Sequence, residues 1–186
     1  MDFTRGETWD LFKAWVLVTA AFLILFGASV NLVSFVLFGI VVGGAVVLHE
    51  LGHKYVAERY GYEARFQSND VMLGIGVLMA FTGFIFIAPG AVHISGLQNR
   101  QQNALIAWAG PAVNAGIALV SYIMIGVAGT TEYFRLLLIV NAILGAFNML
   151  PVGGFDGRKI WLGDKRLYVG TAIVLGVLVV AGFTVG

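Results

Sequence analysis

The stretch LVSFVLFGIVVGGAVVLHELGHKYVA, residues 32–57, is almost entirely apolar up to Leu48 and then carries His49, Glu50 and His53. A helix needs about 20 apolar residues to cross the hydrocarbon core of a bilayer, which is about 30 Å thick. We therefore predict a transmembrane helix here. Ionisable side chains inside such a helix are costly, and they usually mark a functional site. Both the fold and the chemistry of the chain can be worked out from this segment.

The composition of the whole chain favours lipid as its surroundings. Of its 186 residues, 59% are hydrophobic and only 11% are charged, whereas soluble domains have about 25% charged residues. The net charge of +1 gives no electrostatic case for binding nucleic acid. The absence of cysteine excludes disulfides and thiolate zinc sites. We expect one transmembrane domain over residues 1–186, with the lipid bilayer as a partner and no nucleic acid.

Further apolar runs predict more membrane-spanning helices. Five spans are expected, at about residues 11–30, 32–57, 103–128, 133–150 and 167–185. A sixth run, Val71–Ala88, is ambiguous because glycines interrupt it and Pro89 ends it. The fold class that we predict is a membrane all-α protein, a polytopic bundle of about five transmembrane helices.

The distribution of lysine and arginine predicts the orientation, because these residues are concentrated on the cytosolic side of membrane proteins. If Val71–Ala88 does not cross, ten of the 11 positive residues lie on the side of the N-terminus, and only Arg135 lies on the other. We therefore expect the N-terminus in the cytosol and the C-terminus outside.

Three of the polar residues in the second span form the pattern H-E-x-x-H. Residues i and i+4 of a helix lie on one face, so His49 and His53 can bind one zinc ion between them. Glu50 can then take a proton from a water on the metal. The alternative is a surface helix with scattered polar residues, which an apolar span disfavours.

A catalytic zinc ion usually has three protein ligands and one open position. The metzincin class is excluded, because Val56 and Arg59 stand where that class has a glycine and its third histidine. His93 is the one further histidine of the chain, and we expect it to be a passive interfacial residue rather than a residue that supports the site.

Asp156 is the better candidate for the third ligand. It follows the fourth span at the cytosolic level of the two histidines, and Pro151 and paired glycines before it predict an irregular segment. Irregular backbone at membrane depth occurs only where it lines a buried or wet cavity. The alternative is an interfacial aspartate paired with Arg158 or Lys159.

At these residues the sequence resembles the site-2 protease family of intramembrane zinc metalloproteases, in its compact prokaryotic form without a PDZ or CBS domain. The resemblance covers about residues 32–161. Besides H-E-x-x-H, it rests on the motifs N-x-x-P-x-x-x-x-D-G and G-P-x-x-N, matched by Asn148, Pro151, Asp156 and Gly157 and by Gly110, Pro111 and Asn114.

The resemblance implies roles for single residues. His49, His53 and Asp156 would bind one zinc ion per chain, Glu50 would be the general base, and Asn148 would help to hold the substrate backbone. Asn114 has two open interpretations, a substrate-binding residue or a hydrogen bond between helices.

The resemblance also implies a membrane-associated hairpin with strand-like segments at Val71–Ala88, between the second and third spans. This hairpin would either cover the active site or receive an extended substrate as an added strand.

The function that we predict is hydrolysis of peptide bonds within or near the transmembrane helices of other proteins. The enzyme would be a multi-pass protein of a prokaryotic cell membrane, with its active site open to the cytosol. One alternative is an intramembrane metal transporter. Transport favours several metal-binding sites along the membrane, however, and the sequence indicates one. Another is an inactive scaffold, which the intact motifs disfavour.

Overall fold

The computed structural model describes residues 1–84, 88–96, 99–129 and 131–185, and most of these are helical. One long helical stretch is built from helix α2 (Leu32–Phe38), the π-helix η1 (Gly39–Gly43) and helix α3 (Gly44–Arg59). The other long helices are α1 (Arg5–Leu25), α5 (Arg100–Ala128), α6 (Glu132–Asn148) and α8 (Lys165–Thr184). The short helices are α4 (Asp70–Ala80) and α7 (Asp156–Gly163).

Four helices in the described residues are long and apolar enough to cross a membrane: α1, the stretch from α2 to α3, α5 and α8. The predicted helical membrane protein is confirmed at this level. The predicted fourth span corresponds to α6, which has 17 residues and is about 26 Å long at 1.5 Å per residue. It is therefore a little shorter than the hydrocarbon core, and the count of five spans is not confirmed.

Polar caps begin most of these helices. An oxygen of a capping side chain accepts a hydrogen bond from a backbone N–H in the first turn, which would otherwise lack a partner. The caps are Thr4, Asn31, Asn69, Asn99, Thr131 and Asp164.

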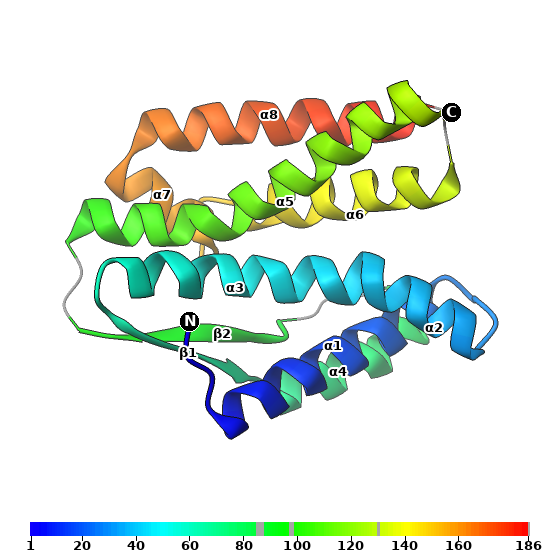
Figure 1. Ribbon diagram of the computed structural model, residues 1–186, viewed down its shortest axis with the longest axis horizontal. Coiled ribbons are helices and arrows are strands. Elements are labelled where there is room, and N and C mark those ends of the chain that lie inside the picture. The colour runs from blue at the N-terminus through cyan, green and yellow to red at the C-terminus, as the bar shows by residue number, and fades with distance from the viewer. Residues whose placement is uncertain (85–87, 97–98, 130, 186) are drawn as a thin grey trace.

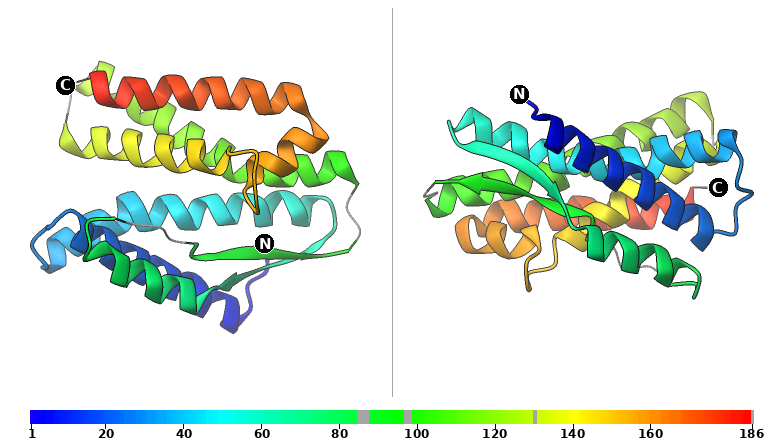
Figure 2. Two further views of the ribbon diagram at one scale, coloured as in Figure 1. Left: turned by 180° about the vertical axis from the view of Figure 1, so that it is seen from behind. Right: turned by 90° about the horizontal axis from the view of Figure 1, so that it is seen from below.

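Helix α3 lies in the middle of the molecule (Figure 1). Helices α5, α6 and α8 form a layer on one side of it, and α1, α4 and a small sheet lie on the other side. Figure 2 shows the same two layers from behind. The buried side chains of α3 therefore face one of two different packing environments.

The small sheet has two antiparallel strands, β1 (Glu63–Ser68) and β2 (Gly90–Ser95). Between them, α4 packs beside α1. The predicted strand-like hairpin at Val71–Ala88 is wrong for most of that run, because its first ten residues belong to α4 and the strands flank the run instead. Residues 85–87 of the run lie outside the described residues.

A physical reason for this difference lies at the start of α4. The side chain of Asn69 caps the helix, and Leu73 is fully buried against α1. The Lys13 ammonium of α1 lies 2.9 Å from the Asp70 carboxylate. Hydrogen bonds from Lys13 and Ser68 hold the pKa of Asp70 below its ordinary value, so this contact between the helices stays charged at neutral pH.

The π-helix η1 packs against α1 through Trp15. The indole N–H of Trp15 donates a 2.8 Å hydrogen bond to the carbonyl of Gly39. A Cβ atom at Gly39 or Gly43 would lie 2.5 Å from the indole ring. Because both glycines lack a side chain, they leave a notch on η1 that holds the indole ring.

A buried ionic cluster ties α1, α3 and β1 together. The Lys54 ammonium is 1% exposed and lies 3.0 Å from Glu7 and 2.9 Å from Glu58. It also donates to the carbonyl of Ala64 at 2.6 Å, and the N–H of Phe66 donates to Glu7 at 3.0 Å. The start of the chain is therefore fixed to the first strand of the sheet.

Candidate metal centre

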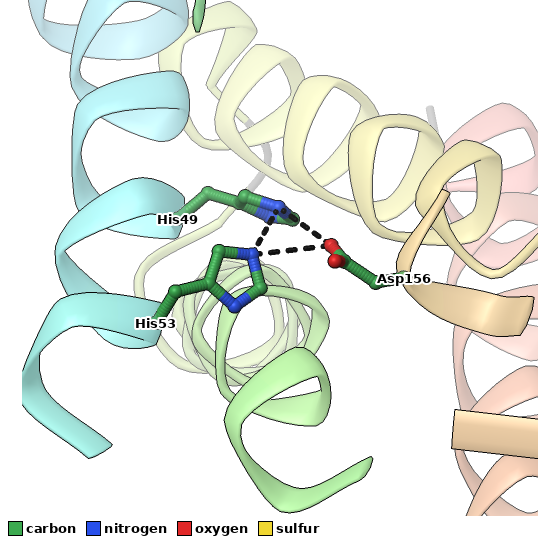
Figure 3. Close-up of side chains that lie close together, drawn as sticks. All are labelled: His49, His53 and Asp156. Carbon is green, nitrogen blue, oxygen red and sulfur yellow. Dashed lines mark hydrogen bonds and ion pairs between the residues drawn. The ribbon is translucent and has the colours of Figure 1, made fainter. Parts of the chain in front are cut away.

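Three side chains from two helices converge beside α5 (Figure 3). His49 and His53 project from one face of α3, and Asp156 is the first residue of α7. All three are buried, and their ligand atoms lie within 4.8 Å of one another. The sequence predicted that Asp156 comes from an irregular segment, whereas the structure places it at the start of a helix that follows such a segment.

The spacing of these atoms suits a tetrahedral metal ion. The Nε2 atoms of His49 and His53 are 3.1 Å apart. The Asp156 Oδ2 atom lies 3.1 Å from the Nε2 of His53 and 3.3 Å from that of His49. Zinc bonds of about 2.0–2.1 Å place neighbouring tetrahedral ligands about 3.3 Å apart, so the donor set fits zinc.

The second nitrogen of each imidazole has its own partner. The Nδ1 of His49 lies 2.6 Å from the side-chain oxygen of Asn114, and the Nδ1 of His53 lies 2.8 Å from the carbonyl of Ile106. Because both partners are acceptors, each Nδ1 carries the proton and each Nε2 keeps its lone pair for a metal. Such partners orient the ligating rings and raise their basicity.

The Asp156 carboxylate is available as an anion. Its Oδ2 oxygen faces the Nε2 atoms of His49 and His53. Lys159 lies 3.5 Å from its second oxygen. The carboxylate therefore offers the form that a metal requires.

Space beside the two imidazoles is kept open by Gly110 of α5. A Cβ atom at this position would lie 2.6 Å from the Nε2 of His49 and closer still to that of His53. A side chain here would crowd the atoms that face the metal position. The sequence motif contained this glycine, but nothing in the motif indicated that its contribution is the absence of a side chain.

Glu50 lies next to His49 on α3 but turns toward the sheet. Its side chain is partly exposed, and the backbone of Val92 in β2 hydrogen-bonds to it. It is not one of the three converging groups. Its carboxylate therefore lies near His49 and Asp156 without being one of the converging groups.

Comparison with known proteins identifies the family. The sequence profile of peptidase family M50 matches residues 37–130. The chain belongs to peptidase family M50. The matched range contains the two histidines, Glu50 and Asn114, while Asp156 lies beyond it.

Curated relatives of this M50 peptidase carry consistent names. The chain is 35% identical over 137 residues to "Putative zinc metalloprotease MJ0611" of Methanocaldococcus jannaschii, covering 70% of this chain and 71% of the relative. It is 30% identical over 121 residues to "Zinc metalloprotease MJ0392" of the same organism, covering 62% of this chain and 30% of the relative. It is 24% identical over 135 residues to "Putative zinc metalloprotease YwhC" of Bacillus subtilis, covering 61% and 62%. No solved structure gave a significant match.

These matches confirm the resemblance to the site-2 protease family and the prediction of a zinc metalloprotease. The matches do not assign roles to single residues. In the M50 peptidase, the structure brings His49, His53 and Asp156 together and places Glu50 beside them.

The remaining predicted residues lie around this centre in different ways. Asn114 is fully buried; its amide nitrogen donates to the Ala45 carbonyl at 3.3 Å and to the Asn141 side chain at 3.0 Å. Of its two interpretations, the contact between helices is the one that these bonds support. Asn148 ends α6 and donates to the Leu144 carbonyl of its own helix at 3.0 Å.

His93 lies apart from the metal ligands. It is an exposed residue of β2, opposite Arg65 of β1. The sequence analysis missed the carbonyl of Ile106 and the side chain of Asn141, because neither a backbone oxygen nor an isolated asparagine belongs to a recognisable metal motif.

Proposed function

We propose that this M50 peptidase is an intramembrane protease that hydrolyses peptide bonds within or near the transmembrane helices of other proteins. The observation that carries the proposal is a buried triad of metal-binding side chains, two of them on a helix long and apolar enough to cross a membrane. An apolar setting of this kind suits a substrate that is itself embedded in lipid.

The chemistry divides between the metal and the side chains. When bound by His49, His53 and Asp156, a zinc ion would act as a Lewis acid and lower the pKa of a bound water molecule to near 7. Glu50 accepts a proton from the attacking water and passes it to the nitrogen of the leaving amine. The amide of Asn148 is the proposed hydrogen-bond donor to the substrate backbone.

The sheet offers a place for the substrate backbone. The N–H of Phe66 points away from β2 and donates to Glu7. In an antiparallel pair the opposite residue then also points its polar backbone groups away from its partner strand. That residue is Val92, whose backbone hydrogen-bonds to Glu50 at the outer edge of β2. A substrate helix has its carbonyls bonded within the helix and must unwind before cleavage. Addition of the unwound segment to the outer edge of β2 would replace those bonds beside Glu50.

We further propose that the protein lies in a prokaryotic cell membrane with five spans, including α6, and with the site open to the cytosol. Introduced cysteines at Arg65, Arg100 and Lys165 should then be labelled from the cytosolic side, and one at Glu132 from outside. The chain has no cysteine of its own, so each label reports one position. Labelling of the Arg65 and Arg100 positions from opposite sides would refute this topology.

The substitution Glu50→Gln tests the proposed chemistry. It removes the base and keeps the shape of the side chain, and Glu50 is not one of the three metal-binding groups. We expect cleavage of a test transmembrane helix in liposomes to fall about 10²- to 10⁴-fold, while zinc content stays near one ion per chain.

Two controls make this test decisive. Chelation of the wild type should abolish cleavage, and added zinc should restore it. Near wild-type cleavage by Glu50→Gln would contradict the mechanism. Zinc flux through wild-type liposomes without cleavage of any tested helix would instead favour a transporter.

A further inference from the structure

A cavity of about 350 Å³, which none of the three metal-binding residues lines, lies at the junction of α5 and α7. Figure 1 shows α7 beside the first turns of α5. The cavity is lined by Arg100, Asn103, Gly153, Arg158, Lys159 and Leu162. Nothing in the chemistry proposed above uses it.

The charge of this cavity is strongly one-sided. Three of its lining residues are cationic and none is acidic. Within the described part of the chain, Arg100 and Arg158 have no ion-pair partner, and the guanidinium of Arg158 bonds only the carbonyl of Gly153, at 3.4 Å. The Lys159 ammonium forms an ion pair with Asp156 at 3.5 Å. Two arginines from two different helices, neither of them ion-paired among the described residues, therefore line one hollow.

The surroundings of the cavity are those of a membrane interface. Trp161 and Leu162 of α7 are exposed, and Lys165 lies over the Trp161 ring at 5.0 Å. Tryptophan and snorkelling lysine are typical of the headgroup level of a bilayer. Basic pockets at this level on the cytoplasmic side are suited to anionic lipid headgroups.

We propose that this cavity binds a phosphate group, in the first place that of an anionic phospholipid headgroup. Arginine side chains present several N–H donors to phosphate oxygens, and the amide of Asn103 adds another donor. A free phosphate ion would use the same donors, but the exposed apolar side chain of Leu162 at the rim suits the glycerol and acyl part of a lipid.

Such a ligand would connect two elements of the site. Arg100 is the first residue of α5, Arg158 lies in the first turn of α7, and Asp156 begins α7. A phosphate held by both arginines would fix α7 against α5 and so hold the third metal-binding group in place. This inference does not depend on peptide hydrolysis, so it can be tested on the inactive Glu50→Gln protein as well.

The experiment measures lipid binding and thermal unfolding of the full chain in detergent, with added phosphatidylglycerol, phosphatidylcholine or inorganic phosphate. Phosphatidylglycerol should remain bound in native mass spectrometry and raise the midpoint of unfolding, whereas phosphatidylcholine should do neither. Affinity should fall about fivefold for Arg100→Gln or Arg158→Gln and about 30-fold for the double variant, from the usual strength of one basic residue at a lipid surface.

Matched variants separate this site from general surface charge. Arg166→Gln removes an exposed cation near the same end of the molecule that does not line the cavity, and it should leave affinity unchanged. The double variant Arg100→Lys and Arg158→Lys keeps the charge and should retain most of the binding. An equal shift with inorganic phosphate alone would support the phosphate site and assign it to the free ion. Unchanged phosphatidylglycerol affinity in the double glutamine variant, or equal loss in Arg166→Gln, would overturn the proposal.

Discussion

The residues around the metal position contribute in two ways, by what their side chains offer and by what they leave empty. The donors His49, His53 and Asp156 could be predicted because residue type and spacing carry that information. Gly110 could not be assigned a role in this way, since its contribution is an absent side chain next to the imidazoles. The carbonyl of Ile106 is equally invisible in a sequence, because every residue has one.

The substitution Gly110→Ala should impair metal binding. Its methyl group would stand within 2.6 Å of the imidazole nitrogens, so the rings must move apart. We expect zinc affinity to fall about tenfold or more, as for other disturbances around metal ligands, measured by competition with a chelator. Gly116→Ala is the control, because no atom of the described residues lies within 4 Å of a Cβ atom at that position of the same helix. Equal affinity in both variants would contradict the role of Gly110.

The substitution Asn114→Ala should also weaken zinc binding, for a different reason. It removes the acceptor that fixes the ring and tautomer of His49. Losing such a partner typically costs about 10- to 100-fold in metal affinity. Ser121→Ala is a suitable control, because Ser121 is a buried polar residue of the same helix whose hydroxyl donates to the carbonyl of Ile117 in its own helix. A variant that lost cleavage with unchanged zinc affinity would instead support the substrate-binding interpretation of Asn114.

Among the elements, the second span shows what an apolar run can and cannot predict. The sequence predicts one helix over residues 32–57, and the structure has one helical stretch over Leu32–Arg59. The π-helix inside it packs against Trp15, a residue of another helix, and a contact of this kind leaves no local pattern in the sequence. By contrast, β1 alternates exposed and buried residues, with Ala64 and Phe66 inward. This alternation can be seen in the sequence, but β1 contains charged residues and therefore lies outside the apolar run for which we predicted the hairpin.

The substitution Trp15→Phe tests the contact between α1 and η1. It keeps an aromatic ring near the notch and removes the hydrogen bond to Gly39. A net loss of about 1 kcal/mol is expected for one such bond, which corresponds to a fall of about 2–4 °C in the unfolding midpoint for a chain of this size. Trp9→Phe, at an exposed position of the same helix, should leave the midpoint unchanged. No difference between the two variants would mean that the hydrogen bond does not stabilise the π-helix.

At the scale of the whole molecule, the cluster around Lys54 joins parts of the chain that are distant in sequence. Glu7, Lys54 and β1 meet in a buried position next to the metal-binding His53. The sequence of α1 gives no hint of this contact, because an acid such as Glu7 in the first turn is common at the start of any helix. The three-dimensional structure is needed to show that Glu7 pairs with Lys54.

The substitution Glu7→Gln should destabilise the protein strongly. The substitution leaves the buried Lys54 ammonium with Glu58 as its remaining carboxylate partner, and breaking a buried ion pair costs about 3 kcal/mol or more. The midpoint of thermal unfolding should fall by about 10 °C. Adding Lys54→Met to Glu7→Gln should recover part of this loss, whereas Asp2→Asn, at an exposed position, should change little. A double variant less stable than Glu7→Gln alone would contradict the ion-pair explanation.

The order of the metal-binding residues along the chain has a consequence for biosynthesis. His49 and His53 are made early, while Asp156 follows after α5 and α6. A nascent or broken chain that ends before α7 therefore has two ligands and lacks the third that a catalytic zinc site requires. The three side chains can therefore meet only after α1 to α6 have been made, with α8 still to follow, so metal loading by this set is a late event in synthesis.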